Sequence, residues 1–177
     1  MPEQKSISDY EKEYPKLRKV TLCYLLNKEN GEVLIAMKKR GFCAGRWNGI
    51  GGKLNEGESI EEALIREAKE EIGVTLTSFR KAGAISFYFS GPGSQDFNQE
   101  VHVFTADSWE GTPKESEEMA PKWVKITNLP FNEMWPDDRL WLKDVLLGAY
   151  VKAKFLFDES GEVKASSVKI TSKKRVK

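Results

Sequence analysis

The sequence contains little histidine and cysteine, and this excludes several common kinds of catalytic site. His102 is the single histidine among 177 residues, and it lies between Val101 and Val103 in a strand-like run. A histidine-based zinc site or a Ser–His triad would depend on that one side chain, so His102 is better interpreted as a strand residue. The two cysteines, Cys23 and Cys43, do not indicate a disulfide framework. We therefore expect a reducing compartment and a cytoplasmic location.

The chain also lacks an excess of charge of either sign and any long apolar run. It has 28 Lys and Arg residues against 27 Asp and Glu, a net charge of +1, so composition gives no general argument for binding a nucleic-acid polymer. No apolar run approaches the roughly 20 residues of a membrane-spanning helix. The opening MPEQKSISDYEKEYPK is mixed in charge and has no apolar core, unlike a secretory signal or a transit peptide. We expect no membrane or nucleic-acid partner and, by default, a monomer.

The order of the predicted elements favours one α/β domain built in layers around a mixed sheet. The predicted strands cover residues 20–26, 33–37, 84–89, 100–105, 123–126, 151–157 and 162–170, and the predicted helices cover 59–72 and 136–147. Asn30 and Gly31 mark a hairpin turn between the first two strands. The second helix begins at Pro136 and would direct Leu140, Val145 and Leu146 inward.

The two ends of the chain differ in composition from the segment between them. Residues 1–18 are charged and non-periodic, which predicts a flexible extension. Residues 19–171 contain all the periodic segments and form the single domain. Residues 172–177 make a basic tail, which is either a nuclear-entry patch or an ordinary solvated end.

Three glutamates in the predicted helix 59–72 carry most of the chemical information. Glu67, Glu70 and Glu71 are spaced i, i+3 and i+4, so they lie on one face of a helix, where their charges repel one another. A solvated acidic face is the ordinary interpretation of such a run. The alternative is a site for Mg²⁺ or Mn²⁺, because hard cations take carboxylate oxygens as ligands and also bind phosphates.

The residues around these glutamates favour the metal site. Ser59 and Glu62 form a capping-box pattern, and Gly73 is suited to ending the helix. The stretch resembles the Nudix box, Gly-x5-Glu-x7-Arg-Glu-U-x-Glu-Glu-x-Gly-U, in which U is apolar. The matching residues are Gly52, Glu58, Arg66, Glu67, Ala68, Glu70, Glu71, Gly73 and Val74. The resemblance implies the Nudix fold, an α/β/α sandwich around a mixed sheet, and a metal-dependent hydrolase.

The resemblance also implies roles for individual residues of the box. The expected ligands of Mg²⁺, for which Mn²⁺ can substitute, are the Gly51 carbonyl, Glu67, Glu70, Glu71 and, from outside the box, Glu118. Arg66 would orient the carboxylates, and Glu58 would support the junction between loop and helix. The general base is Glu71 or Glu118, and the sequence does not choose between them.

A second set of motifs resembles the MutT-homologue oxidised purine nucleoside triphosphatases and covers about residues 20–157. The motifs are MKKRGF, GRWNGIGGK, VHVF, GTP, ESEEM and MWPDD. Trp135 in the last motif offers a flat face on which a purine can stack. Asp137 and Asp138 are adjacent carboxyl groups that resist ionising together when buried, so that one can donate while the other accepts. Asn48 would contact the base from the other side.

This closer resemblance implies a substrate and a larger binding set. The family hydrolyses 8-oxo-dGTP and 2-oxo-dATP to the monophosphate and pyrophosphate, which removes mutagenic nucleotides from the pool, and O6-methyl-dGTP is a further candidate substrate. The candidate substrate-binding residues are Thr21, Lys38, Phe42, Asn48, Ile50, Gly51, Gly52, Lys53, Phe87, Phe89, Trp135, Pro136, Asp137 and Asp138. Lys38 and Lys53 are expected at the phosphates, and the phenylalanines are expected to form apolar walls.

The chain departs from the family pattern at two places. Cys43 stands where the family has glycine, and the loop 91–99 is longer than usual and shows no match for a pocket methionine. Two other functions stay open. One is a Nudix hydrolase of another nucleoside diphosphate derivative, such as a dinucleotide polyphosphate or a nucleotide sugar. The other is a nucleotide-binding Nudix module without catalysis. A decapping-type enzyme would need a basic path for RNA, which the charge balance does not favour.

Overall fold

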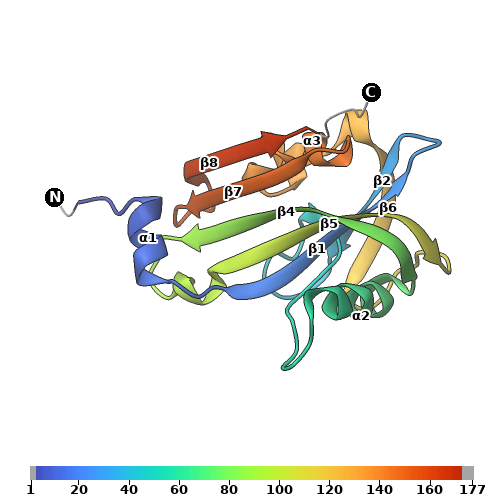
Figure 1. Cartoon of the computed structure of the whole chain (residues 1–177), viewed down its shortest axis with the longest axis horizontal. Helices are drawn as coiled ribbons and strands as arrows, with labels where there is room; N and C mark the ends of the chain where they lie inside the picture. Colours follow the sequence, from blue (N-terminus) through green and yellow to red (C-terminus); the bar gives the residue numbers. More distant parts are fainter. Residues whose placement is uncertain (1–2, 173–177) are drawn as a thin grey trace.

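The computed structural model describes residues 3–172, which form one mixed sheet with helical segments on both of its faces (Figure 1). The strands are β1 (Arg18–Asn27), β2 (Glu32–Lys38), β3 (Trp47–Asn48), β4 (Thr75–Phe89), β5 (Gln99–Glu110), β6 (Met119–Lys125), β7 (Tyr150–Phe157) and β8 (Val163–Thr171). The α-helices are α1 (Ile7–Glu13), α2 (Ile60–Ile72) and α3 (Leu142–Leu146). The short 3₁₀ helices are η1 (Ser94–Phe97), η2 (Ile126–Asn128), η3 (Phe131–Glu133) and η4 (Pro136–Leu140). The predicted layered α/β architecture is confirmed.

The sheet combines parallel and antiparallel neighbours. Its strand order is β3-β2-β1-β5-β4-β7-β8, with β6 paired to β2. The β1–β5 and β4–β7 pairs are parallel, and the others are antiparallel. The predicted hairpin turn between β1 and β2 is present, and Gly31 there has a φ of 63°, which suits glycine.

Two apolar cores pack against opposite faces of the sheet. On one face, Leu64, Ala68 and Ile72 of α2 belong to a buried cluster with strand residues that include Leu25 and Phe104. The other core contains residues of α3 and of the segments just before it, packed on β1, β2, β4, β5 and β7. Its members from outside the sheet are Met134, Trp141, Leu142, Val145 and Leu146. Figure 1 shows α2 on one side of the sheet and α3 on the other.

Helix α2 forms where the sequence predicts it, and both of its ends have the expected caps. The Ser59 hydroxyl accepts a hydrogen bond from the Glu62 backbone N–H, and the Glu62 carboxylate accepts one from the Ser59 N–H. Gly73 ends the helix with a left-handed φ of 75°. The caps leave the box glutamates on a helix with defined ends.

The predicted helix 136–147 was wrong as a continuous element. The segment is split into η4 and α3 at Trp141, whose φ of −146° is not helical. The Trp141 side chain is buried and donates from Nε1 to Asp137, so burying this ring and keeping its N–H bonded interrupts the helix. Val145 and Leu146 are buried as predicted, but Leu140 is 46% exposed instead of facing inward.

The expected N-terminal extension contains a helix that lies against the sheet. Helix α1 is capped by a reciprocal pair of hydrogen bonds between Ser6 and Asp9. Tyr10 packs on Tyr88 with ring centroids 5.9 Å apart, and Glu11 pairs with Lys154 of β7. The sequence did not reveal this because a seven-residue helix without an apolar stripe has no detectable period. The basic tail predicted at 172–177 lies outside the described residues, apart from its first residue.

Two strands are longer than predicted. Strand β4 starts at Thr75, well before the predicted residue 84, and strand β5 continues to Glu110. The pairing of β4 with β5 contains register shifts, which break the alternation that sequence patterns rely on. His102 is confirmed as a buried residue of β5. Among the described residues, no helix is long and apolar enough to cross a membrane.

Candidate active site

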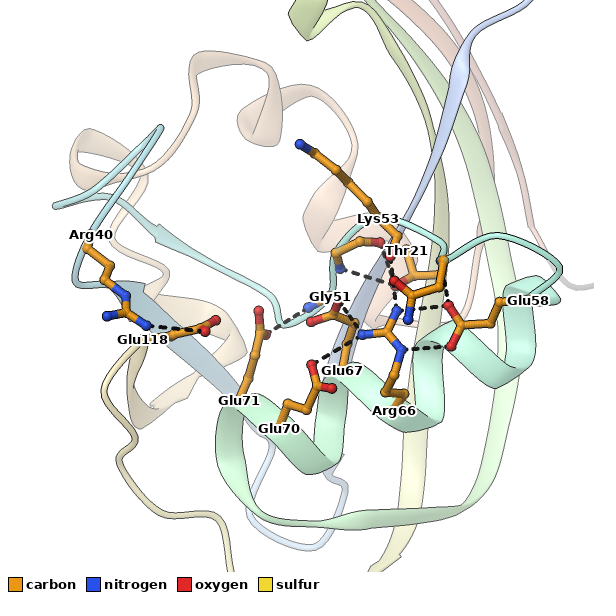
Figure 2. A network of polar contacts seen from close by, with 12 residues as sticks. Thr21, Arg40, Gly51, Lys53, Glu58, Arg66, Glu67, Glu70, Glu71 and Glu118 are labelled. Atoms are coloured by element: carbon orange, nitrogen blue, oxygen red, sulfur yellow. Dashed lines mark hydrogen bonds and ion pairs between the residues drawn. The ribbon is translucent and has the colours of Figure 1, made fainter.

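Arg66 on α2 connects the glutamates of the box to the loop that precedes the helix. Its Nε and Nη2 donate to the two carboxylate oxygens of Glu58 at 2.7 and 2.8 Å. Its Nη1 donates to Glu67 at 2.8 Å and to Glu70 at 3.2 Å, and Nη2 also donates to the Lys53 carbonyl at 3.0 Å. Figure 2 shows Arg66 at the centre of this network. Arg66 therefore contacts the carboxylates that it is expected to orient, and Glu58 lies at the loop–helix junction that it is expected to support.

The charges of this network are mutually stabilised. Hydrogen bonds from Arg66 and from the Asn55 backbone N–H lower the pKa of Glu58 to about 2. Hydrogen bonds to Glu58 and then to Glu67 raise the pKa of Arg66 above its ordinary value. Glu58 is therefore ionised throughout the physiological range, and its bidentate pairing with Arg66 is the geometry a guanidinium prefers.

Glu71 points from α2 toward the loop that contains Gly49, Gly51 and Gly52, here called the glycine loop, and is the most buried of the box glutamates. Its carboxylate accepts a hydrogen bond of 3.0 Å from the Gly51 N–H. Burial raises the pKa of Glu71 to about 8, and the charges of Glu67 and Glu118 act in the same direction. Gly51 has a φ of 148°, and a Cβ on it would lie 2.0 Å from the Thr21 carbonyl oxygen. Only glycine at this position allows the loop to lie so close to β1.

The remaining predicted metal ligands are held by arginines. Glu67 and Glu70 contact Arg66, whereas Glu118 lies 3.5 Å from Arg40 and its side chain is 56% exposed. Within residues 3–172, no group of three or more His, Cys, Asp or Glu side chains is arranged around a common metal position. The five predicted ligands are therefore near one another without converging on one point.

The chemistry of these donors nevertheless fits a divalent cation. They are oxygen donors, which hard cations prefer. Burial raises the pKa of Glu67, and the nearby charges of Glu70 and Glu118 raise it further, whereas Arg66 opposes them. A cation bound between such carboxylates would offset their mutual electrostatic repulsion and lower their pKa values.

A cavity of about 380 Å³ runs beside the glycine loop and joins it to the MWPDD segment. Twelve of the fourteen candidate substrate-binding residues line it: Thr21, Lys38, Phe42, Asn48, Gly51, Gly52, Lys53, Phe87, Phe89, Trp135, Asp137 and Asp138. Ile50 and Pro136 do not. Ile50 is only 2% exposed and belongs to the core beneath α2, paired with Cys23. Of the predicted metal ligands, Gly51 and Glu71 reach the cavity wall, and Glu67, Glu70 and Glu118 do not.

One end of the cavity is lined by buried polar groups. Asp137 and Asp138 are 2% and 3% exposed, and Asp137 accepts a hydrogen bond of 2.8 Å from the Trp141 N–H. Burial raises the pKa of Asp137 to about 6. Burial and then the neighbouring Asp137 charge raise the pKa of Asp138 well above its ordinary value. Of the two carboxyl groups, Asp138 therefore holds a proton more readily than Asp137, so the pair is suited to offer one donor beside one acceptor.

Asn48 adds donors to the same end of the cavity. Its Oδ1 accepts hydrogen bonds from the Tyr24 hydroxyl at 2.9 Å and from the Gly49 N–H at 2.8 Å. These contacts occupy the amide oxygen and orient the side chain. The amide NH₂ is left for a ligand, so Asn48 is a donor here, where its residue type alone allowed either role.

Aromatic rings form the walls next to the polar end. Trp135, Phe89 and Phe157 pack together with centroid separations between 5.2 and 6.2 Å. The Arg46 guanidinium lies 4.5 Å from the Trp135 ring centroid, and its Nη1 donates to the Met134 carbonyl. Phe97 stacks on Phe42 with centroids 4.1 Å apart.

Several cavity residues were missed by the sequence reasoning. They are Arg18, Val20, Leu22, Cys43, Gly49, Arg46, Phe97, Gln99, Val101, Met119, Trp141 and Phe157. The position of Arg46, two residues before Asn48 in GRWNG, was an available signal. Phe97 and Gln99 lie in or beside the loop 91–99, where the family pattern could not be aligned. Cys43, the one non-glycine residue with a positive φ (71°) among the described residues, lies at the position where the family has glycine.

The comparisons with known proteins agree with this fold and this box. The model of the NUDIX domain matches residues 16–145. The chain therefore belongs to the Nudix family, whose hydrolases generally depend on divalent metal ions.

Within the family, the chain is similar to proteins named for one activity. It is 49% identical over 120 residues to the oxidized purine nucleoside triphosphate hydrolase of Danio rerio, covering 68% of this chain and 75% of that protein. It is 45% identical over 138 residues to the protein of the same name from Mus musculus, covering 77% and 86%. Among solved structures, the MutT protein of Bacillus halodurans matches with a TM-score of 0.72 at 26% identity, covering 86% of this chain and 97% of that one.

Proposed function

We propose that this protein hydrolyses oxidised purine nucleoside triphosphates to the monophosphate and pyrophosphate and so sanitises the nucleotide pool. The observation that carries the proposal is the single cavity in which Gly51 and Glu71 of the Nudix box lie together with Asn48, Asp137 and Asp138. One part of this cavity has the residues to cut a diphosphate, and another part has the residues to recognise a base. The names of the zebrafish and mouse relatives support the same substrate class.

The polar end of the cavity is complementary to the edge of an altered purine. A guanine-type edge offers two donors and a carbonyl acceptor. With the proton on Asp138, whose pKa burial raises further than that of Asp137, Asp137 accepts while Asp138 and the Asn48 amide donate. Moving the proton between the two aspartates reverses one donor and one acceptor, which fits the edge of 2-oxo-adenine. We therefore propose 8-oxo-dGTP and 2-oxo-dATP as substrates, with O6-methyl-dGTP as a further candidate.

We assign the metal to Mg²⁺, with Mn²⁺ as a substitute, held by the Gly51 carbonyl, Glu67, Glu70, Glu71 and Glu118. When bound, the ion supplies charge neutralisation at the phosphates and a more acidic water. The chain itself positions the reacting groups: Arg66 holds Glu67 and Glu70, and Gly51 holds Glu71. Glu71 is favoured over Glu118 as the general base because it lines the cavity.

The test is a comparison of kcat/KM for 8-oxo-dGTP, 2-oxo-dATP, O6-methyl-dGTP, dGTP and ADP-ribose in the presence of Mg²⁺. We expect at least about tenfold preference for an oxidised purine over dGTP, the discrimination that one additional good hydrogen bond supports. A chelator should abolish turnover, and Mg²⁺ or Mn²⁺ should restore it. Equal rates on all five compounds would favour a Nudix hydrolase of broader specificity. Nucleotide binding without pyrophosphate release would favour a non-catalytic module.

The proposal also includes a cytoplasmic enzyme acting as a monomer. Size-exclusion chromatography combined with light scattering at working concentration should give the 20.1 kDa mass of a single chain.

A further inference from the structure

The basic side chains that line the cavity have no acidic partner within residues 3–172. They are Arg18, Lys38, Arg46 and Lys53, and none of them takes part in an ion pair there. Outside the cavity wall, Lys39, Arg40 and Arg66 are each paired with glutamate. Unpaired cations gathered at a partly enclosed cavity favour an anionic ligand, since burying an uncompensated charge is costly.

Arg18 differs from the other three because no family motif contains it. It is the first residue of β1, is partly buried, and lies opposite Gln99, the first residue of β5. Its Nη2 donates to Oε1 of Gln99 at 3.2 Å, whereas its buried Nε has no hydrogen-bond partner in the described part of the chain. Gln99 therefore fixes the guanidinium at the cavity wall while most of its donors stay unused.

Different parts of the cavity lie next to successive residues of strand β1. Tyr24 contacts Asn48 at the end that recognises the base. Thr21 donates to the Gly52 carbonyl beside the glycine loop, and Val20 pairs with Lys53. Arg18 lies two residues before Val20 in the chain, on the same face of the strand. Figure 2 shows Thr21, Gly51 and Lys53 close together, with the Lys53 side chain extended away from α2.

We propose that Arg18, held in position by Gln99, binds the terminal phosphate of the nucleoside triphosphate. A substrate whose base lies at Asn48 and whose diphosphate passes Gly51 extends toward Lys53 and Arg18. The planar guanidinium forms forked, charge-assisted hydrogen bonds to phosphate oxygens. Arg18 would then select triphosphates over shorter nucleotides, and Gln99 is a positioning residue that acts through Arg18. This inference rests on the proposed cleavage of a nucleoside triphosphate but not on which base is preferred.

The experiment uses the full chain, Mg²⁺, and whichever nucleoside triphosphate the wild type hydrolyses best. Arg18→Gln should raise KM for the triphosphate about tenfold, because a charge-assisted hydrogen bond is lost. The inhibition constant of pyrophosphate should rise by a similar factor, because pyrophosphate contains the terminal phosphate. The inhibition constant of the corresponding monophosphate should change by less than about twofold, since the monophosphate does not reach Arg18. The difference from wild type should shrink as salt is raised from about 50 to 500 mM.

The matched control is Lys19→Gln, which removes the same charge from the adjacent residue of β1, outside the cavity. It should leave KM and both inhibition constants unchanged. Arg18→Lys should recover part of the affinity because it keeps the charge without the fork. Gln99→Met should also raise KM, but by a smaller factor. This variant serves as the test if Arg18→Gln does not fold.

Three outcomes would overturn the inference. One is a KM for the triphosphate that stays within about twofold of wild type, well below the loss expected for a charged contact. The second is a pyrophosphate inhibition constant that does not follow the KM. The third is an equal rise for the monophosphate, which would place Arg18 at the nucleoside. A wild type that is indifferent to base oxidation would instead reject the proposed substrate class and would leave the Arg18 comparison interpretable.

Discussion

The aspartate pair shows how two identical side chains acquire different properties from their surroundings. Asp137 has the Trp141 N–H as a hydrogen-bond donor, and this opposes the rise in its pKa that burial causes. Asp138 has no partner for Oδ2 within residues 3–172 and also lies next to the charge of Asp137. The proton therefore favours Asp138. The hydrogen bond from Trp141 thus adds to the difference in pKa between the two carboxyl groups.

This difference predicts a pH-dependent stability effect of Asp138→Asn. A carboxyl group with a raised pKa in the folded state binds its proton more tightly there than in the unfolded chain, where the pKa is near 3.8. Its stabilising contribution is complete below that value and is lost as pH rises through the higher, folded pKa. Asparagine stays neutral, so the variant should gain stability relative to wild type by about 1 kcal/mol or more between about pH 5 and 8.

The measurement is urea denaturation of both proteins across that pH range. Asp144→Asn, at an exposed position of α3, is the control and should show a difference from wild type that does not vary with pH. A difference for Asp138→Asn that is equally flat would mean that Asp138 is already ionised at neutral pH, and the donor–acceptor assignment would be wrong.

At the scale of elements, the sequence predicted well those segments whose signals are local. The caps of α2 depend on Ser59, Glu62 and Gly73, which are close in the chain, and the helix has the expected limits. The MWPDD and GRWNG motifs, which are also local, located most of the residues that we propose to recognise the base. The short apolar runs of β1 and β2, with the Asn30-Gly31 turn between them, likewise identified these strands with errors of only a few residues at their ends.

Elements that depend on distant contacts could not be predicted in this way. Residues 136–147 have a helical composition, but burying Trp141 against the sheet divides them. Phe97 becomes a cavity residue because Asn98 accepts a hydrogen bond from the Phe89 N–H and ties the loop to the end of β4. Arg18 lines the cavity because the parallel pairing of β1 with β5 places it opposite Gln99. None of these contacts has a signature within a short window of sequence.

The junction between the glycine loop and α2 leads to a prediction for Arg66→Lys. Lysine keeps the positive charge but cannot contact both oxygens of Glu58 together with Glu67 and the Lys53 carbonyl. We expect kcat to fall about tenfold or more, because the carboxylates lose their orientation. Steady-state kinetics at saturating Mg²⁺ is the measurement. Arg139→Lys, at an exposed arginine of η4, is the control and should keep wild-type kcat. Unchanged kcat in Arg66→Lys would show that Arg66 serves only the fold.

At the scale of the whole molecule, the sheet separates the two halves of the site. Helix α2 and its glutamates pack on one face, whereas η4 with Asp137 and Asp138 packs with the core of the other. The glycine loop beside β1 links them, since Thr21 and Cys23 bond its backbone between Ile50 and Gly52. We therefore expect the proposed cutting and base-recognising residues to depend on different layers of the fold, so that each set can be altered separately.

This separation predicts opposite behaviour for two isosteric variants. Glu71→Gln should lower Mg²⁺-dependent pyrophosphate release by about 10²–10⁴-fold, the usual contribution of a general base. It should bind 8-oxo-dGMP within about twofold of wild type, because its side chain does not lie at the base end and the amide still accepts from Gly51. Asp138→Leu should bind 8-oxo-dGMP about tenfold more weakly or worse, since it removes the carboxyl group that is proposed to donate to the base.

Calorimetric titration of 8-oxo-dGMP and a pyrophosphate-release assay measure the two properties separately. Glu61→Gln, at an exposed position in the first turn of α2, removes the same charge from the same helix and should leave both properties unchanged. Wild-type turnover by Glu71→Gln would reject its assignment as the general base. Equal weakening of nucleotide binding in Glu71→Gln and Asp138→Leu would show that the two layers act as one unit, because a change in the α2 layer would then disturb the base-recognising layer across the sheet.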